Sequence, residues 1–325
     1  MLGNPAIAVV TDAWMKGIRG YDAQKALRMC MATADRIGHH PGLDYSPGGS
    51  GISETLEYAY TDWCVGQLAR ALGYADTAAV YHRRGQAYHH VFDAEKGWFR
   101  VREADGSWAA WPEKGRLQEW YGCMECNPWQ QGWFVPHDVP GMTALMGGRE
   151  KTLADLVSFF DQTPREFYWN PYYNHANEPV HHVPYLFNRL GAPWLTQYWT
   201  RAICADAYKN NLAGLCGNED VGQISAWYIL SSIGIHPLCP GETRYELTAP
   251  VFSRVEITLD RRYAKGRRFV ITASRNQPSD CYIQRATLNG KPLNRCYIDH
   301  SEIVAGGELH FELGSTPNKE WGVAP

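Results

Sequence analysis

Three acidic motifs in this chain carry side chains that could perform acid–base or metal chemistry. In the first motif, Glu125 lies in the run Cys-Met-Glu-Cys-Asn-Pro, and Trp129 and Trp133 follow shortly after it. A carboxylic acid among tryptophans is desolvated, which raises its pKa and keeps it protonated near neutral pH. Such a group can act as a general acid toward a sugar leaving group. The alternative is an ordinary surface glutamate in a loop.

The second and third motifs place carboxylate and amide oxygens directly before predicted helices. They contain Asn177-Glu178 and, further along the chain, Asp220. Simple N-capping accounts for such residues, because Asn and Asp accept hydrogen bonds from the first N–H groups of a helix. The alternative is a hard-cation site, since these oxygens suit calcium. The adjacent His181 and His182 make a poor zinc pair, because neighbouring residues on a helix point about 100° apart.

Carboxylates on separate segments, together with many aromatic rings, match the requirements of glycoside hydrolysis. One carboxylic acid protonates the departing oxygen, while a second carboxylate activates water or attacks the sugar ring. The chain has 13 Trp and 19 Tyr against 10 Phe. Trp and Tyr combine an apolar face with a polar edge and therefore suit sugar binding, although a large core also uses many aromatic rings.

Length and composition exclude several classes of protein. The 325 residues are 45% hydrophobic and 20% charged with a net charge of −3, which excludes a disordered chain. A pI of about 6.5 without a Lys/Arg block argues against nucleic-acid binding. The longest uncharged stretch, Val221–Gly241, holds polar residues and a proline, so no membrane span is expected. Nine cysteines leave at least one unpaired, and the Cys123/Cys126 pair lacks the second pair of a zinc site.

The elements that must position these motifs change character along the chain. Helical periodicity predicts helices over 5–18, 22–37, 53–72, 75–92, 149–162, 179–190, 193–210 and 222–233. Ser53 is expected to cap the third of them. A loop over about 93–148 holds six tryptophans, and so long a loop usually has a function. From residue 244 the period becomes two, and Asn289-Gly290 predicts a hairpin turn, so the tail is a β region.

Four long segments have a recognisable pattern, namely Glu54–Trp63, Asn127–Asp138, Asn177–Asn188 and Gly217–Tyr228. In this order they resemble glycoside hydrolase family 92, the calcium-dependent, inverting, exo-acting α-mannosidases. Short matches in the tail extend the resemblance over essentially the whole chain. The resemblance implies a mainly α fold, with a partial (α/α)6 toroid over residues 1–243. The C-terminal antiparallel strands of 244–325 would return to the side of an N-terminal β-sandwich.

The resemblance also implies roles for particular residues. By position in the motifs, Glu125 corresponds to the general acid and Asp220 to the general base, which also faces the cation. Asn177 and Glu178 would complete the protein's ligands to Ca²⁺. The residues expected to shape the sugar pocket are Trp129, Trp133, His137, Asp138 and His181.

The implied activity is removal of terminal α-linked mannose from mannose-containing glycans, with α1,2-type linkages favoured. Inversion implies about 6.5–9.5 Å between the carboxyl groups of Glu125 and Asp220. Export from the cytoplasm, or a periplasmic location, is expected by resemblance only.

The chain departs from the family pattern in places. Asn218 stands where some members have an acidic residue, so the second carboxylate is absent or supplied by Glu219. The N-terminal sandwich and the first toroid helices are expected to be missing from this chain. Two alternatives therefore stay open: a fragment that only binds mannose-type sugars, and a toroid glycosidase that acts on another sugar.

Overall fold

The computed structural model describes residues 2 and 4–323, and the chain divides into two compact units. The first unit contains the chain up to Asp155 together with Cys239–Glu242, and the second contains Leu156–Leu238 and the chain from Thr243 onward. The predicted division after residue 243 follows the change from helical to β structure, whereas the compact units divide the chain at other points.

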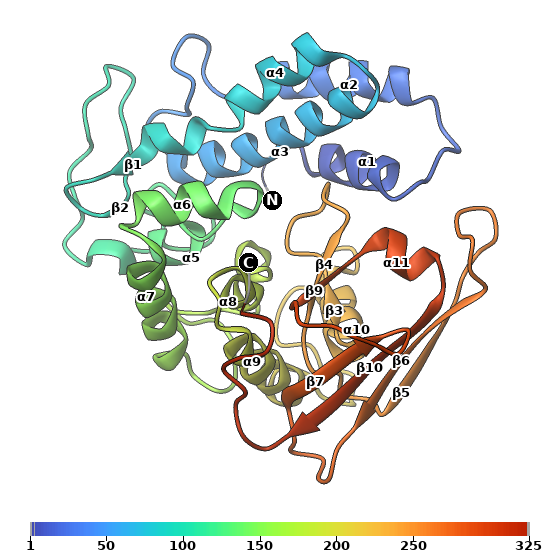
Figure 1. The fold of residues 1–325 in the computed structure, drawn as a ribbon. Helices are drawn as coiled ribbons and strands as arrows, with labels where there is room; N and C mark the ends of the chain where they lie inside the picture. The colour runs from blue at the N-terminus through green and yellow to red at the C-terminus, as the bar shows by residue number, and fades with distance from the viewer. Residues whose placement is uncertain (1, 3, 324–325) are drawn as a thin grey trace. The chain divides into compact units, whose positions relative to one another are not determined.

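A long buried helix organises the first unit. This helix, α3 (Gly51–Ala71), contacts α1 (Pro5–Met15), α2 (Ala23–Arg36) and α4 (Ala75–Arg84), as Figure 1 shows in blue and cyan. Nearly all of α3 is buried, because apolar and small residues lie on every side of it. These helices confirm the predicted ones to within a few residues, except that 75–92 is α4 followed by a separate 3₁₀ helix.

The segment predicted to be one long loop contains several short elements. They are β1 (Phe92–Asp93), β2 (Trp98–Phe99), η2 (Gly115–Leu117), α5 (Pro128–Gln131), η3 (Pro136–Asp138) and α6 (Val139–Leu145). The 3₁₀ helix that precedes them is η1 (Ala87–Val91), and the helix that follows them is α7 (Arg149–Asp161). Four- and seven-residue helices fall below the length at which hydrophobic periodicity is readable, which is why the sequence did not reveal α5 and α6.

The helices of the second unit include one predicted helix that is divided. Residues 179–190 form η4 (Glu178–Val180), η5 (Val183–Tyr185) and α8 (Leu186–Arg189) instead of one helix. Pro179 and Pro184 each lie in the first turn of a 3₁₀ helix, and neither has an N–H to continue a longer helix. The other helices are α9 (Pro193–Asp206), α10 (Gln223–Ile233) and α11 (His300–Val304).

Two sheets complete the second unit. The larger sheet has the order β5 (Arg254–Thr258), β6 (Arg268–Ser274), β10 (Gly307–Gly314), β7 (Tyr282–Leu288) and β8 (Lys291–Pro292). The smaller sheet has the order β3 (Ile235–His236), β4 (Arg244–Leu247) and β9 (Tyr297–Asp299). Pairing is antiparallel, as predicted, except that β10 runs parallel to β6. The predicted hairpin is confirmed, because Asn289 and Gly290 join β7 to β8 with φ of 51° and 75°.

A buried polar cluster joins α8 to the smaller sheet within this unit. The Glu246 carboxylate is fully buried and is paired with Arg189 at 2.6 Å and Arg244 at 2.8 Å. The Asn188 amide donates hydrogen bonds to Glu246 and to the carbonyl oxygens of Leu247 and Cys296. Two arginines compensate the buried charge, so this cluster fixes the start of the sheet against the helices that follow the Asn177-Glu178 motif.

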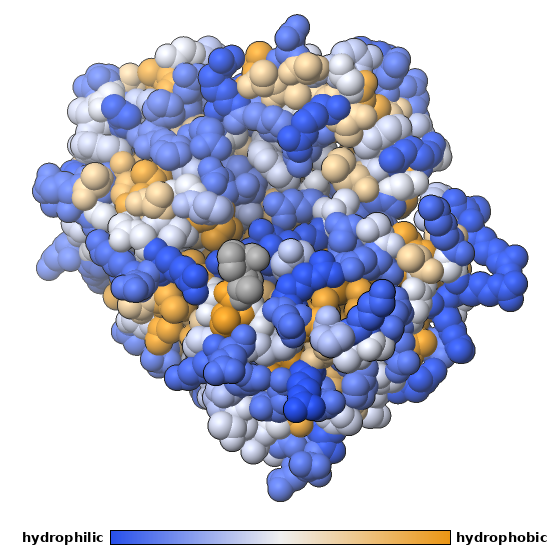
Figure 2. Space-filling model, in the orientation of Figure 1, coloured by the Kyte–Doolittle hydropathy of each residue, from blue (hydrophilic) through white to orange (hydrophobic). Residues whose placement is uncertain are grey.

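The one face of the molecule drawn in Figure 2 is mainly hydrophilic. On the face drawn in Figure 2, hydrophobic residues form small separate groups among hydrophilic ones. Among the residues that the structure describes, no helix is both long and apolar enough to cross a membrane. All nine cysteines are free thiols, and all but Cys216 are buried.

Candidate active site

The loop that carries Glu125 is fastened to the first turn of α3. The N–H groups of Ile52 and Ser53 both donate to the carbonyl oxygen of Gly122, at 2.9 and 3.0 Å. The Ser53 hydroxyl accepts from the N–H of Met124 at 2.9 Å and donates to the Gln131 side chain at 2.8 Å. Ser53 therefore lies inside the helix and holds this loop, rather than capping the helix as the sequence suggested.

Glu125 itself has a strained backbone and an exposed side chain. Its φ is 58°, in the left-handed region that residues other than glycine rarely adopt. Such conformations persist where the surrounding structure imposes them, and they cluster at functional sites. The expectation that tryptophans bury Glu125 is wrong for this chain, because the residue is exposed to solvent. The carboxyl group is therefore presented outward on a turn whose flanking residues are held firmly.

The Ser53 hydroxyl provides a test of this arrangement. We expect Ser53→Ala to lower the free energy of unfolding of the first unit by about 1–3 kcal/mol, because it leaves the partly buried N–H of Met124 without its acceptor. Amide hydrogen exchange at residues 122–126 should become faster than in the wild type. Thr55→Ser serves as a control in the same helix. Unchanged exchange in this loop would show that Ser53 does not hold it.

The other expected sugar-pocket residues of the first unit are largely built into its packing. Trp133 is fully buried with its ring edge-on to Trp98 at 5.1 Å, and Trp129 stacks against the Arg116 guanidinium at 4.2 Å. Asp138 caps α6 by accepting from the Gly141 N–H and also accepts from the Tyr88 hydroxyl. The indole of Trp133 thus has no free face for a sugar, and the Asp138 carboxylate already serves a helix.

His137 is also held from within the protein. Its Nε2 donates to the carbonyl oxygen of Gly85 at 2.8 Å, and its ring lies among those of Tyr60, Trp63 and Tyr88. Burial lowers the pKa of His137 to about 4, so the imidazole is neutral at physiological pH. Its packing supports the segment between α5 and α6.

In the second unit, the two segments expected to bind a cation meet. Gly217 lies against Ala176 so closely that a Cβ at position 217 would be 2.4 Å from the Ala176 Cα. Only glycine permits this approach, which brings the Asn177-Glu178 segment beside the residues that precede α10. The carboxyl groups of Glu178 and Asp220 are hydrogen-bonded to each other. The structure therefore brings together two carboxyl groups that are 42 positions apart in the sequence.

The backbone at Asp220 is in the left-handed region, as it is at Glu125. Asp220 and Val221 have φ of 43° and 57°, and Gly222 follows with 92° before α10 begins. The Glu219 carboxylate accepts from the N–H and the hydroxyl of Ser225, each at 3.2 Å. Glu219 therefore serves the first turn of α10 and does not supply the second carboxylate of the pair, whereas Asp220 turns toward Glu178.

Two carboxyl groups this close require either a shared proton or a cation. Burial, followed by the hydrogen bond from Asp220, raises the pKa of Glu178 to about 7. The Glu178 Oε1 atom is buried without a hydrogen-bond partner in the described structure. Such an oxygen suits a hard cation. Among the described residues no group of three or more His, Cys, Asp or Glu side chains is placed to hold a metal, so the buried Asn177 amide would have to join the two carboxylates.

His181 joins the same two segments through hydrogen bonds. Its Nε2 donates to the carbonyl oxygen of His175 at 3.0 Å, so Nδ1 is the acceptor for the Gln223 amide at 3.2 Å. The Trp227 indole N–H donates to the His181 carbonyl oxygen at 2.8 Å. His181, which was expected to contact the sugar, is therefore a buried side chain that connects the Asn177-Glu178 segment to α10. His182 is buried as well.

The buried histidines give the protein an expected pH dependence. Burial lowers the pKa of His181 and of His137 to about 4, whereas the unfolded chain takes up these protons near 6.5. The unfolded state binds more protons between those values. Stability is therefore fully present above about 6.5 and falls as pH drops toward 4, by about 3 kcal/mol for each group.

Urea unfolding at pH 7.5 and 5.0 checks this expectation. His181→Gln should lose less stability on acidification than the wild type, because glutamine can still donate to His175 and accept from Gln223 without titrating. His310→Gln, a substitution on β10, is the control. An identical acid-induced loss in the wild type and in His181→Gln would refute the linkage.

Sequence reasoning missed the residues that hold the acidic side chains in place. Ser53 and Gln131 fasten the Glu125 loop, and Gly217 and Gln223 bring the two cation segments together. Only Gly217 left a readable signal, since a glycine directly before an acidic run suggests a close backbone approach. Glu125 lies in the first unit and Asp220 in the second, so their separation stays a prediction.

Comparison with known proteins identifies the family. The model of the glycosyl hydrolase family 92 catalytic domain matches residues 1–315. An uncharacterized secreted glycosidase of Arthroderma benhamiae is 29% identical over 317 residues, covering 88% of this chain and 39% of that protein. A family GH92 inverting mannosidase of Bacteroides thetaiotaomicron is 33% identical with a TM-score of 0.88, covering 100% of this chain and 48% of that one.

A family GH92 alpha-mannosidase of the same bacterium is 30% identical with a TM-score of 0.91, covering 100% of this chain and 44% of that one. The chain thus spans less than half the length of these relatives. The resemblance of the four motifs, the mainly α fold with its C-terminal sheet and the match over residues 1–315 agree. The chain belongs to glycoside hydrolase family 92.

Proposed function

We propose that the protein is an exo-acting α-mannosidase that hydrolyses terminal α-linked mannose with inversion, assisted by calcium and with α1,2-type linkages favoured. The observation that carries the proposal is the hydrogen-bonded pair of Glu178 and Asp220 on two segments that Gly217 brings together. The name of the inverting mannosidase and that of the alpha-mannosidase support the choice of sugar. The secreted relative supports export of the protein.

In the proposed mechanism, Asp220 and Glu125 have complementary roles. The Asp220 carboxylate accepts a proton from water as that water attacks the anomeric carbon. The Glu125 carboxyl group donates its proton to the glycosidic oxygen as the bond breaks. Water supplies the new anomeric hydroxyl of mannose, and the leaving group departs as an alcohol that carries the proton from Glu125. The strained backbone at both residues supports this assignment, since functional sites commonly store such strain.

A calcium ion would be held by Asn177, Glu178 and Asp220 and would act as a template that orients sugar hydroxyls. Without it, Glu178 and Asp220 must share a proton. Their hydrogen-bonded contact and the partnerless Glu178 Oε1 support a cation at this position. The positive charge of the ion would offset the repulsion between the two carboxylates.

Removing the metal gives a testable outcome that is separate from catalysis. Calcium at about 100 times its Kd should stabilise the protein by about 2.7 kcal/mol relative to chelated protein. For units of this size that corresponds to a rise of about 5–11 °C in Tm. Glu178→Gln should abolish the shift, whereas Glu219→Gln should keep it. A Tm that is the same in calcium and in chelator would contradict calcium binding at these residues.

A panel of aryl glycosides tests the substrate class. The assay uses the natural full-length polypeptide. We expect release of the aryl group from α-mannoside and little release from α-glucoside, α-galactoside or β-mannoside. Among disaccharides, α1,2-mannobiose should be cleaved fastest. Preference for a gluco-configured substrate would indicate a glycosidase for another sugar. Mannose binding without turnover would indicate a protein that only binds such sugars.

A further inference from the structure

The first unit contains a pocket that none of the candidate catalytic residues lines. Its volume is about 590 Å³, within the range of about 300–1,000 Å³ typical of small-molecule sites. The walls come from the ends of α2 and α4, the segment 39–44, and η1. The side chains that matter for its chemistry are Asp35, His39, Asp44, Arg83, Arg84 and His90.

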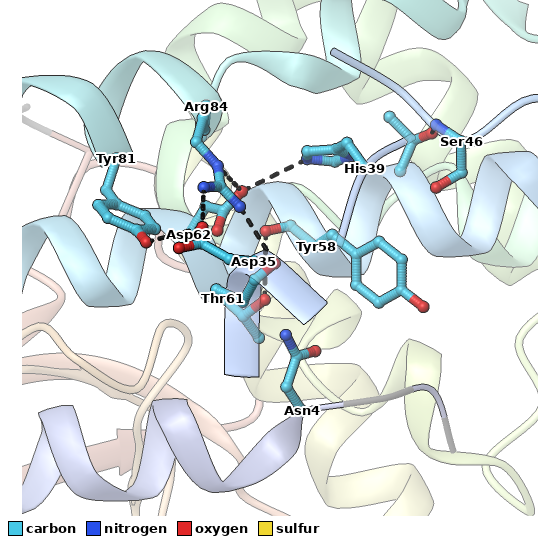
Figure 3. A network of polar contacts seen from close by, with 12 residues as sticks. Asn4, Asp35, His39, Ser46, Tyr58, Thr61, Asp62, Tyr81 and Arg84 are labelled. Carbon is cyan, nitrogen blue, oxygen red and sulfur yellow. Dashed lines mark hydrogen bonds and ion pairs between the residues drawn. The ribbon is translucent and has the colours of Figure 1, made fainter. Parts of the chain in front are cut away.

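His39 is the unusual member of this wall. Its side chain is only 6% exposed, yet neither ring nitrogen has a hydrogen-bond partner in the described structure. The closest charged group is Asp62, whose Oδ2 lies 3.6 Å from Nε2, and Tyr58 contacts the ring edge-on (Figure 3). A buried polar group without a partner is costly, so a ligand or water that supplies one is favoured.

The protonation state of His39 limits the chemical classes of ligand that the pocket can bind. Burial and the positive charge of Arg84 lower the pKa of His39 to about 3, so the ring is neutral at physiological pH. A neutral imidazole offers one N–H donor and one acceptor nitrogen. A sugar hydroxyl can therefore donate to one ring nitrogen or accept from the other, whereas a fully ionised inorganic anion can only accept from the N–H.

The charged groups around the pocket are balanced, because Asp35 and Asp44 line it together with Arg83 and Arg84. Arg84 is already paired with Asp35 at 2.6 Å and with Asp62 at 2.9 Å, as Figure 3 shows. The carboxylates of Asp35 and Asp44 line the same wall and would repel a second negative charge. A metal is also unsupported, because the described residues hold no group of three or more His, Cys, Asp or Glu placed for one.

Flat rings form part of η1 beside these polar groups. The ring of His90 stacks on that of Tyr45 with centroids 6.2 Å apart, and the ring of His89 lies tilted against that of Tyr88 with centroids 4.3 Å apart. Both histidines line the pocket and are exposed. The imidazole rings can pack against the C–H face of a ligand ring. The neighbouring carboxylate and guanidinium groups can form hydrogen bonds with hydroxyls on that same ligand ring.

We propose that this pocket is a binding site for a neutral hexopyranose, whose hydroxyls would pair with His39, Asp35 and Asp44. The proposal goes beyond the hydrolytic reaction and depends on none of its residues. It is therefore tested by a readout inside the first unit that does not require turnover.

The test is an NMR titration of protein labelled with ¹⁵N at histidine, kept in chelator so that hydrolysis does not interfere. Methyl α-mannopyranoside should shift the ring resonances of His39 and saturate with a Kd on the order of 1 mM, the weak end of the affinity scale. Inorganic phosphate and open-chain sorbitol are the comparison probes. Neither should reproduce the shift at equal concentration.

Two substitutions connect the signal to the pocket, with binding followed at His90 and by calorimetry. His39→Phe keeps the ring that contacts Tyr58 and removes both nitrogens, so affinity should fall about tenfold. Asp44→Asn should also weaken binding. The fold should be intact in this variant, because residue 44 is exposed and asparagine tolerates its backbone φ of 57°. His310→Phe is the matched control in the second unit and should bind as the wild type does.

Three results would overturn the proposal. They are no response of His39 to the mannoside, an equal response to sorbitol, and a response to phosphate alone. The first would mean that water occupies the pocket, the second that it has no preference for a sugar ring, and the third that it binds anions. Loss of hydrolysis in any assay would leave this test unchanged, so the two proposals fail separately.

Discussion

Substituting Asp220 with asparagine is expected to lower kcat/KM toward α-mannosides by about 10³-fold, because the group that takes the proton from water is removed. Asparagine has nearly the same shape and tolerates the φ of 43° at this position. Its amide oxygen can still face a cation, and it can still pair with Glu178. The substitution therefore changes proton acceptance while it leaves the local structure in place.

Kinetics with an aryl α-mannoside in saturating calcium measure this loss. The adjacent Glu219→Gln is the control, because Glu219 holds the first turn of α10 and should affect stability more than kcat. The loss in Asp220→Asn should be similar for good and poor leaving groups, since a base acts on the attacking water. An Asp220→Asn protein that keeps more than about a tenth of wild-type activity would exclude Asp220 as the base.

Substituting Glu125 with glutamine is expected to have an effect that depends on the leaving group. For mannobiose or an alkyl mannoside, kcat/KM should fall by about 10²–10⁴-fold, because the departing oxygen needs a proton. For a dinitrophenyl mannoside, whose leaving group departs without protonation, the loss should be far smaller. The two substrates share the same sugar, so binding of mannose does not explain the difference.

The control for this series is Glu119→Gln, an exposed glutamate in the same loop that should leave all substrates unaffected. The fold at Glu125 should be intact in the glutamine variant, because the contacts of Ser53 with Met124 and Gln131 do not involve the substituted group. Equal losses for mannobiose and the dinitrophenyl substrate would contradict the role of Glu125 as the acid.

Much of the helical framework could be predicted from local sequence. The helices α1, α2, α3, α7, α9 and α10 each have ten or more residues, which is long enough for their sequences to predict them. Gly234 ends α10 in a left-handed conformation, as a glycine at that position should. The Asn289-Gly290 turn was predicted for the same reason, because few sequences fit two successive positive φ values. In these places the local preference and the fold agree.

Other features depend on contacts between distant residues and could not be predicted. The parallel pairing of β10 with β6 brings Leu309 opposite Ile271 through tertiary packing, which a period of two does not specify. The exposure of Glu125 depends on how the loop turns above α3, not on the tryptophans near it in sequence. Ser53 fits a helix cap by type, but its hydroxyl is used by Met124 and Gln131 instead.

The candidate site shows the same division. Glu178 and Asp220 could be named from motif position, and the structure brings them into contact. The competing use of Glu219 at α10 and of His181 between two segments became visible only with the fold, because capping and metal binding recruit the same residue types.

The stereochemistry of the first product tests directly whether hydrolysis proceeds with inversion and with Asp220 as the general base. Proton NMR during hydrolysis of an aryl α-mannoside distinguishes the two anomers of mannose before they interconvert. We expect β-mannose to appear first and α-mannose to form only by mutarotation, because water assisted by Asp220 attacks the face opposite the leaving group. Initial release of α-mannose would contradict it, since that outcome requires a covalent intermediate and a carboxylate that attacks the sugar itself.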